Sequence, residues 1–304
     1  MNFLNLIRWK NLLLIATVQL LIKYALLEPF GVQTALSSLG ISLLMLATLC
    51  IAAAGYIIND IFDVETDSIN KPEKLIVGKS ISEKTAYNLF FIFNMVGVGV
   101  GYYVSNLVNK DAFFSLFVII SVLLYVYASY LKQMLLVGNI IVAILVALSL
   151  VIVGVFELLP TLTPLNRQTQ LFFFKILLNY ALFAFFINLL REIIKDMEDI
   201  NGDYKAGMNT LPIAIGIERS AKVVFVLTIV LLFAVGYYVV NVLYKNQIMV
   251  LYFLVFIMGP LLYLAIKMFS ANTKKEFHQM SQVLKLVMLF GMGSLLFYLF
   301  LLKL

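Results

Sequence analysis

Nine apolar runs, each about as long as a membrane-spanning helix, follow one another along the 304 residues. A helix needs about 20 apolar residues to cross a bilayer, and in hydrocarbon it satisfies its own backbone hydrogen bonds. The runs lack the alternation of an outer-membrane barrel strand. With 63% hydrophobic and 12% charged residues, the chain could not cover its apolar surface in water. The sequence therefore predicts an all-α, multi-pass integral membrane protein.

The expected spans are Asn11–Leu27, Ala35–Ile58, Tyr87–Leu107, Phe113–Leu131, Leu135–Leu158, Leu171–Leu190, Val223–Leu243, Ile248–Met268 and Val283–Leu302. Two long, charged connections separate them, at residues 59–83 and 191–222. We expect one membrane domain over residues 1–304, with nine transmembrane helices around a central cavity and these two segments as caps. Both caps follow an even-numbered span and carry acids at the same spacing, which predicts two pseudo-repeated four-helix units plus one helix.

The basic residues distinguish the two faces of the membrane. If the connections alternate between faces, all but six of the 22 Lys and Arg residues fall on one face. The six on the other face are Lys23, Lys110, Arg167, Lys175, Lys245 and Lys303. Because short cytoplasmic loops are rich in Lys and Arg, both caps are predicted to lie in the cytoplasm, at a cell (inner) membrane. The same bias explains the net charge of +6, so no nucleic-acid partner is predicted. Glu157 and Arg167 fall near the outer surface, where we expect no special role.

The rare residue types exclude several chemistries. Cys50 is the only cysteine, which rules out an intrachain disulfide, a cysteine-based zinc site and a CxxC redox pair. His278 is the only histidine, so a histidine metal cluster is excluded and a Ser-His-Asp triad is disfavoured. Carboxylates, amides, lysines, arginines and tyrosines remain for catalysis.

Two acidic segments carry the most informative pattern. The first acidic segment (residues 59–67) places Asp60, Asp63 and Asp67 along one face of a helix, with Asn59 one turn before Asp63. The second acidic segment (residues 191–203) repeats that spacing. Its three stripe acids are Asp196, Asp199 and Asp203.

Like charges along one stripe repel unless a cation lies among them. Mg²⁺ prefers oxygen ligands and binds through one or two carboxylates together with substrate phosphates. Two such stripes at the membrane edge fit a Mg²⁺-dependent enzyme that binds a diphosphate. A solvated loop face would explain one segment but not the matched spacing of two. Glu65 and Glu198 lie off the stripes and are predicted to be ordinary surface acids.

At these residues the chain resembles the UbiA superfamily of intramembrane prenyltransferases. Asn59, Asp60, Asp63 and Asp67 match the family motif NDxxDxxxD, and Asn70-Lys71-Pro72 follow as its common NKP. The DxxDxxxD motif is matched by the second stripe. Lys74 departs from the pattern, since many members carry Arg there. The resemblance covers essentially the whole chain, and the pair of motifs within nine spans is highly specific.

The resemblance implies a transferase that moves a prenyl group from a prenyl diphosphate donor, such as geranylgeranyl diphosphate, with release of diphosphate. Tyr127 and Lys132 look like the family's Tyr/Lys region, although an interfacial anchor would have the same composition. The implied residues are, for catalysis, Asp63, Asp67, Asp199, Asp203, Lys132 and Tyr127; for substrate binding, Lys71, Lys74, Arg191, Lys195 and Asn139; and for Mg²⁺, Asn59, Asp60, Asp63, Asp67, Asp196, Asp199 and Asp203.

The acceptor is left open between two classes, a lipid and an aromatic molecule. The run from Arg191 to Pro212 and the stretch from Leu131 to Asn139 are most similar to the branch that alkylates geranylgeranylglyceryl phosphate, in ether-lipid biosynthesis. The alternative is an aromatic quinone precursor of the menaquinone or ubiquinone type. Two rivals of other classes are a cation transporter and a membrane protein without catalysis. Transporters usually place their carboxylates near the bilayer midplane, whereas these acids lie at span ends.

Overall fold

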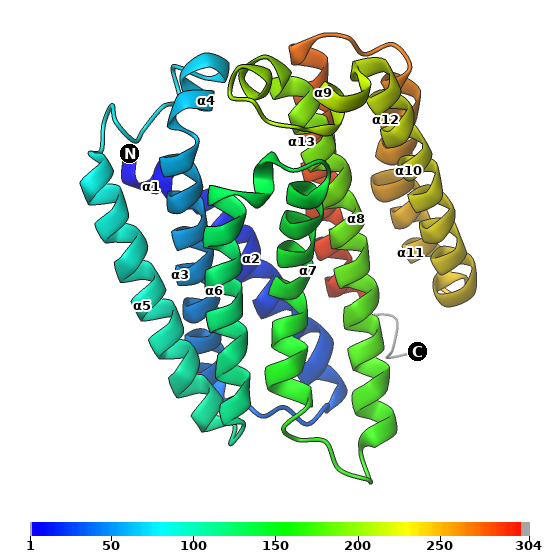
Figure 1. Ribbon diagram of the computed structural model, residues 1–304. Coiled ribbons are helices and arrows are strands. Elements are labelled where there is room, and N and C mark those ends of the chain that lie inside the picture. The colour runs from blue at the N-terminus through cyan, green and yellow to red at the C-terminus, as the bar shows by residue number, and fades with distance from the viewer. Residues whose placement is uncertain (1, 299–304) are drawn as a thin grey trace. The chain divides into compact units, whose positions relative to one another are not determined.

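The computed structural model describes residues 2–298, and almost all of this length is helical (Figure 1). No strand is assigned among these residues, which contain only an isolated bridge between Val77 and Ile81. Nine helical segments in this part of the chain are long and apolar enough to cross a membrane, which confirms the predicted fold class. They are Trp9–Phe30, Ser38–Phe62, Glu83–Leu107, Asp111–Ser129, Val137–Leu158, Arg167–Lys205, Ile217–Leu243, Gln247–Met268 and Lys274–Phe297. The predicted end of the ninth span, Leu302, lies outside the described residues.

The chain divides into two compact units. Unit 1 consists of the described residues up to Lys132 together with Ala147–Ala181, and unit 2 of Gln133–Val146 together with the described residues from Leu182 onward. Helices α7 (Val137–Leu158) and α8 (Arg167–Lys205) contribute residues to both units. The division therefore passes through two helices. The single domain over residues 1–304 stays a prediction, and so does the repeat of two four-helix units.

Unit 1 contains the elements of the first four spans and the short helices next to them. They are α1 (Asn2–Leu6), α2 (Trp9–Leu21), the π-helix η1 (Ile22–Leu27), the 3₁₀ turn η2 (Glu28–Phe30), α3 (Ser38–Phe62), α4 (Val64–Asn70), α5 (Glu83–Leu107), η3 (Asp111–Phe113) and α6 (Phe114–Ser129), and η4 (Leu131–Gln133) follows at its boundary. Helix α3 packs closely against α5 because Gly97 brings the two backbones together. A Cβ added at Gly97 would lie 2.7 Å from Ile51 and 3.1 Å from the Ala47 carbonyl oxygen. Small residues allow this close approach between membrane helices.

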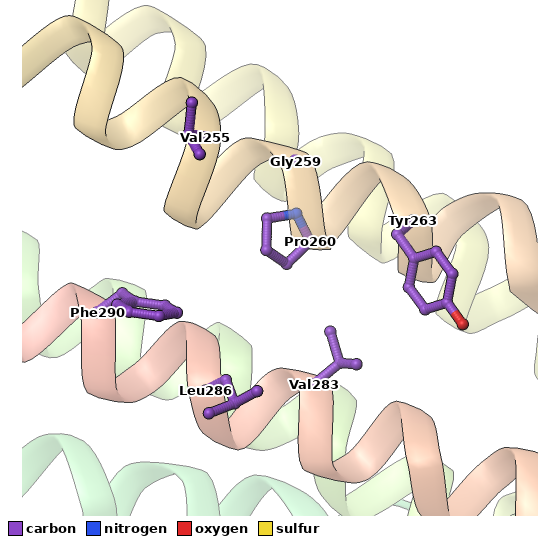
Figure 2. Close-up of a pocket in the computed structure, with 7 residues that line it drawn as sticks. All are labelled: Val255, Gly259, Pro260, Tyr263, Val283, Leu286 and Phe290. Carbon is purple, nitrogen blue, oxygen red and sulfur yellow. The ribbon is translucent and has the colours of Figure 1, made fainter.

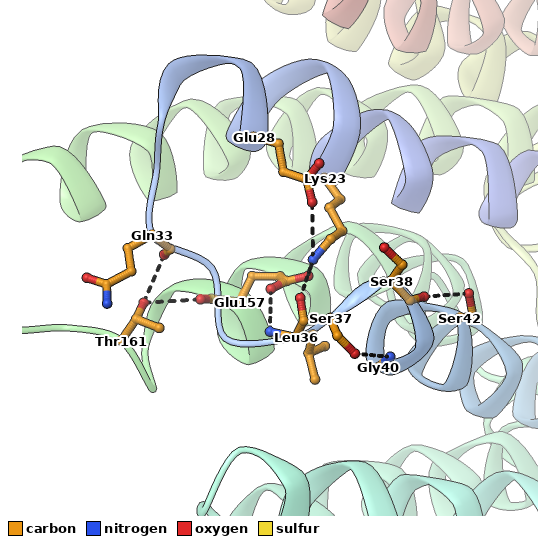
Figure 3. Close-up of polar contacts among 10 residues, drawn as sticks. All are labelled: Lys23, Glu28, Gln33, Leu36, Ser37, Ser38, Gly40, Ser42, Glu157 and Thr161. Atoms are coloured by element: carbon orange, nitrogen blue, oxygen red, sulfur yellow. Dashed lines mark hydrogen bonds and ion pairs between the residues drawn. The ribbon is translucent and has the colours of Figure 1, made fainter.

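A buried ion pair joins three segments of unit 1 (Figure 3). Lys23 in η1 donates to Glu157 Oε1 in α7 at 2.8 Å and to the carbonyl oxygen of Leu36. Glu157 Oε2 accepts from the Leu36 backbone N–H at 3.0 Å. The Lys23 side chain is 1% exposed and that of Glu157 is fully buried. The expectation that Glu157 has no special role was therefore wrong, because an acid inside a membrane protein needs a partner and here has two.

Unit 2 contains the remaining elements. They are α9 (Leu211–Ile215), α10 (Ile217–Tyr238), the π-helix η5 (Val239–Leu243), α11 (Gln247–Tyr252), the π-helix η6 (Phe253–Met258), α12 (Gly259–Met268), α13 (Lys274–Gly293) and the 3₁₀ turn η7 (Ser294–Phe297). One apolar core runs through these helices and the unit 2 part of α8. Its fully buried members include Leu190, Ile257 and Leu284.

The second cap differs from the predicted connecting segment at residues 191–222. Helix α8 continues without a break to Lys205, so the second acidic segment lies on a helix rather than in a loop. Its 39 residues correspond to about 58 Å, which exceeds the roughly 30 Å of bilayer hydrocarbon. The helix ends before Gly207, whose φ of 69° favours glycine.

Candidate active site

The backbone of the first acidic segment bends slightly at its centre. Helix α3 ends at Phe62 and α4 begins at Val64, and Asp63 between them has φ −94° and ψ 1°. The helical hydrogen bonds nevertheless continue, from Asp63 N to Asn59 O at 2.9 Å and from Asp67 N to Asp63 O at 2.7 Å. The predicted stripe is thus retained across the junction of the two helices.

Asp63 is the centre of a polar cluster in unit 1. Its Oδ1 accepts from Lys132 Nζ at 2.6 Å, and its Oδ2 accepts from Asn59 Nδ2. The Lys132 side chain is only 8% exposed. The Asn59 amide oxygen Oδ1 is buried and has no hydrogen-bond partner. An unpaired buried oxygen beside a carboxylate costs free energy, and a divalent cation with oxygen ligands would relieve that cost.

Asp60 is held by a different cation. Its Oδ1 accepts from Arg8 at 2.8 Å, and the Arg8 guanidinium lies 5.0 Å from the centre of the Tyr56 ring. Arg8 adopts the left-handed conformation, with φ 49°, immediately before α2. This strained backbone turns the chain between α1 and α2 beside Asp60. The sequence placed Arg8 among the basic residues of the predicted cytoplasmic face that could contact a phosphate, and did not predict its contact with Asp60.

Asp67 is the third acid of this segment. Burial and, secondly, the charge of Asp63 raise the pKa of Asp67 to about 6, and the nearby charge of Lys71 partly offsets them. A bound cation would favour the ionised form. Lys71 directly follows α4, Lys74 is exposed in the next turn, and Tyr127 packs against the apolar core of unit 1.

The second acidic segment occupies the C-terminal part of α8, in unit 2. Asp196 accepts from Asn139 Nδ2 of α7 at 2.8 Å. Asp199 is partly buried, and Asp203 is buried. Asn139 was predicted to bind substrate, and the structure places it as a hydrogen-bond donor to a predicted metal ligand.

Glu192 and Glu198 lie outside the stripes but make contacts that the spacing of the acids did not predict. Glu192 accepts from Lys195 at 2.8 Å and from Arg191 at 3.5 Å, so it orders two predicted substrate-binding cations. Glu198 contacts His278 of α13 at 3.1 Å, and its side chain is 7% exposed. The expectation of an ordinary surface acid at Glu198 was therefore wrong. The three-residue spacing between Glu192 and Lys195 could have predicted their ion pair, because it places both on one helix face. Nothing in the sequence indicated the contact between Glu198 and His278.

Within residues 2–298, no three His, Cys, Asp or Glu side chains are grouped closely enough to hold a metal ion. In unit 1, Asp60 contacts Arg8 and Asp63 contacts Lys132. Because like charges repel, each of these two carboxylates pairs with a cation of its own instead of sharing a site with the other. The residues nevertheless fit a divalent cation, because the first acidic segment combines an unpaired amide oxygen with carboxylates. The ligand set itself stays a prediction.

These features define a class of protein: a multi-pass helical membrane protein with two acidic segments at the ends of its spans. The UbiA prenyltransferase family matches residues 14–301, and the chain belongs to this family. It is therefore a prenyltransferase, as the resemblance implied.

Individual relatives agree with the family. The digeranylgeranylglyceryl phosphate synthase of Sulfurisphaera tokodaii is 36% identical over 218 residues, which cover 69% of this chain and 70% of that protein. The chain also resembles a solved structure from work on digeranylgeranylglyceryl phosphate synthase in membranes. The TM-score is 0.61 and the identity 25%, over 97% of this chain and 98% of that one. A UbiA homologue from Archaeoglobus fulgidus bound to GPP and Mg²⁺ shares the fold, with a TM-score of 0.57 and 18% identity over 97% and 99%.

Proposed function

We propose that the chain transfers a prenyl group from a prenyl diphosphate, such as geranylgeranyl diphosphate, to geranylgeranylglyceryl phosphate in a Mg²⁺-dependent reaction. The observation that carries the proposal is the cluster of the Asp63 carboxylate, the unpaired Asn59 oxygen and the Lys132 ammonium. The cluster combines ligands for a divalent cation with a positive group for a diphosphate. The named relatives support the choice of acceptor, because their product carries two geranylgeranyl groups on one glyceryl phosphate.

In the proposed reaction, the bond between C1 of the prenyl group and its diphosphate oxygen breaks. The acceptor hydroxyl oxygen forms an ether bond to that carbon, its proton passes to water, and diphosphate is released. When bound, Mg²⁺ would neutralise the negative charge that develops on the leaving group. Lys132, which contacts Asp63 in the structure, would exchange that carboxylate for a diphosphate oxygen. No protein nucleophile is needed, which fits a chain with one cysteine and one histidine.

The remaining roles follow the sequence prediction. We propose that the metal ligands are Asn59, Asp60, Asp63, Asp67, Asp196, Asp199 and Asp203, and that Tyr127 shields or orients the prenyl cation. Of these acids, Asp60 is the weakest candidate, because it would have to exchange Arg8 for the metal. Lys71, Lys74, Arg191 and Lys195 are proposed to contact substrate phosphates, and Glu192 to hold the last two in place.

The acceptor can be tested directly. We expect purified protein given geranylgeranyl diphosphate and Mg²⁺ to prenylate geranylgeranylglyceryl phosphate at least about tenfold faster than 4-hydroxybenzoate or a naphthoate. The reason is that a phosphate-bearing acceptor gains charge-assisted hydrogen bonds worth about 1.5–3 kcal/mol each. Chromatography of the lipid products provides the measurement. Prenylation of the aromatic acid with none of the glyceryl phosphate would reverse the acceptor while leaving the prenyltransferase class intact.

We further propose that both acidic segments face the cytoplasm. Reporter fusions after Lys79 and Lys205 should report a cytoplasmic location, and a fusion after Leu304 the opposite side, because basic residues concentrate on the cytoplasmic face. Paired alkaline phosphatase and fluorescent protein fusions measure both outcomes. If the fusion at Lys205 reported the outside while that at Lys79 reported the cytoplasm, the common orientation would be wrong.

A further inference from the structure

An apolar groove lies between two consecutive membrane helices of unit 2 (Figure 2). Its cavity volume is about 420 Å³, within the range of roughly 300–1,000 Å³ that is usual for small-molecule sites. One wall comes from η6 and α12, the other from α13, and the side chains face one another across the gap. The lining residues are Val255, Gly259, Pro260, Tyr263, Val283, Leu286 and Phe290.

The groove exists because of the residues at its centre. Gly259 has no side chain to fill the space, and Pro260 follows it at the start of α12. Immediately before them, η6 is a π-helix, an irregularity that often marks functional sites. Val255, Tyr263 and Leu286 are exposed, so the groove opens to the surroundings of the protein. Because these helices are membrane spans, the medium that meets the opening is hydrocarbon.

One end of the groove is positively charged. Lys267 lies one turn beyond Tyr263 on α12, and Lys275 lies on the same face of α13 as Leu286, eleven residues earlier. Both lysines are exposed. Only five residues separate α12 from α13, so the C-terminal end of one and the N-terminal end of the other lie together.

Glu276 is the only acid in α12, α13 and the turn between them, and it is engaged by the helix cap, while Glu198 of α8 contacts His278 of α13. Glu276 Oε2 accepts from the Thr273 hydroxyl at 2.7 Å, from the Thr273 backbone N–H at 3.0 Å and from the Asn272 N–H at 3.1 Å. These hydrogen bonds form part of a capping box and hold the carboxylate at the start of α13. Lys267 and Lys275 together outweigh its single charge. This end therefore attracts anions.

We propose that the groove binds one phosphate-bearing lipid of the bilayer, with a hydrocarbon chain between α12 and α13 and the phosphate against Lys267 and Lys275. Tyr263 lies at one end of the groove with its hydroxyl directed away from Pro260 (Figure 2), and Lys267 follows it one turn later on α12, so a polar group marks the end at which a lipid would change from apolar to polar. The end with the lysines is also the end of α13 where His278 contacts Glu198 of the second acidic segment. A bound lipid would thus brace the helix that supports this segment. The proposal does not depend on the identity of the prenyl acceptor.

The test uses the fact that Trp9 is the only tryptophan. In a Trp9→Phe background, Phe290→Trp places a fluorescent reporter in the groove, and Leu262→Trp places one on an exposed position of α12 outside it. Each protein is titrated in detergent with phosphatidylglycerol or phosphatidylcholine carrying brominated chains, which quench nearby tryptophan. The groove reporter should be quenched at a markedly lower concentration of phosphatidylglycerol, whereas the Leu262→Trp reporter should show no preference.

Lys267→Gln and Lys275→Gln should each weaken phosphatidylglycerol binding at the groove reporter about fivefold, as expected for about 1 kcal/mol per basic residue near an anionic lipid. Lys110→Gln, an exposed lysine in unit 1, is the matched control and should change nothing. Equal quenching by both lipids at the groove reporter would contradict the proposal. So would displacement of the brominated lipid by one equivalent of geranylgeranylglyceryl phosphate, which would assign the groove to a substrate instead.

Discussion

Asp63→Ala is expected to lower the rate of prenyl transfer at least about 100-fold, the usual cost of removing one group that stabilises charge in a transition state. Asp63 lies at the centre of the first stripe, and its two oxygens contact Lys132 and Asn59. Its loss removes a proposed metal ligand and releases Lys132, the proposed diphosphate contact. Product formation is measured at saturating Mg²⁺, together with the melting temperature in detergent.

Two further variants separate catalysis from folding. Asp63→Asn keeps the shape of the side chain and can still accept from Lys132, so it should fold normally and remain inactive. Glu65→Gln removes an exposed acid of α4 outside the stripe and should retain most of the activity. A folded Asp63→Asn protein with more than half of the wild-type rate would overturn the role of this carboxylate.

Asp199→Ala makes the corresponding change in the second acidic segment. We expect a loss of similar size, because Asp199 has the central position in a stripe with the same spacing. The paired measurement has diagnostic value. If Asp63→Ala were inactive and Asp199→Ala fully active, the first segment alone would carry the metal chemistry, and the matched spacing would have no functional meaning.

The fold class could be predicted because hydropathy reports the medium around each helix directly. The number of spans and the helical stripe of acids followed from composition and periodicity alone. The helix ends were harder to predict, since polar turns contribute nothing to a hydropathy run. Helix α13 begins at Lys274 rather than at the predicted Val283, because Thr273 and Glu276 form a capping box ahead of the apolar part. Helix α8 likewise extends past the predicted Leu190 through its acidic turns.

The polar pairs between residues far apart in the sequence were the least predictable part. Arg8 and Asp60 are 52 residues apart, Glu198 and His278 are 80 apart, and Lys23 and Glu157 are 134 apart. Residue type and local spacing carry no information about such partners, because tertiary packing brings them together. Local pairs were accessible in principle, as with Glu192 and Lys195, where helical spacing places acid and base on one face.

Lys23→Met is expected to destabilise the protein by about 3–5 kcal/mol, because it leaves a buried charge on Glu157 without its cation. The cost is high because the Glu157 side chain is fully buried within a membrane protein. Lys110→Met removes an exposed lysine of the same unit and should leave the melting temperature in detergent unchanged.

The double variant Lys23→Met/Glu157→Gln should recover more than half of the lost stability. It removes both charges, and the glutamine can still accept from the Leu36 N–H that Glu157 Oε2 binds. Transfer activity per folded molecule should stay near wild type in both variants. The ion pair lies beside Leu36, just before α3 begins, whereas Asp60 and Asp63 lie at the far end of that helix, about 37 Å away along 25 residues. A single variant as stable as wild type would show that the pair contributes nothing to folding. A double variant no more stable than Lys23→Met would show that the loss came from packing rather than from the unpaired charge.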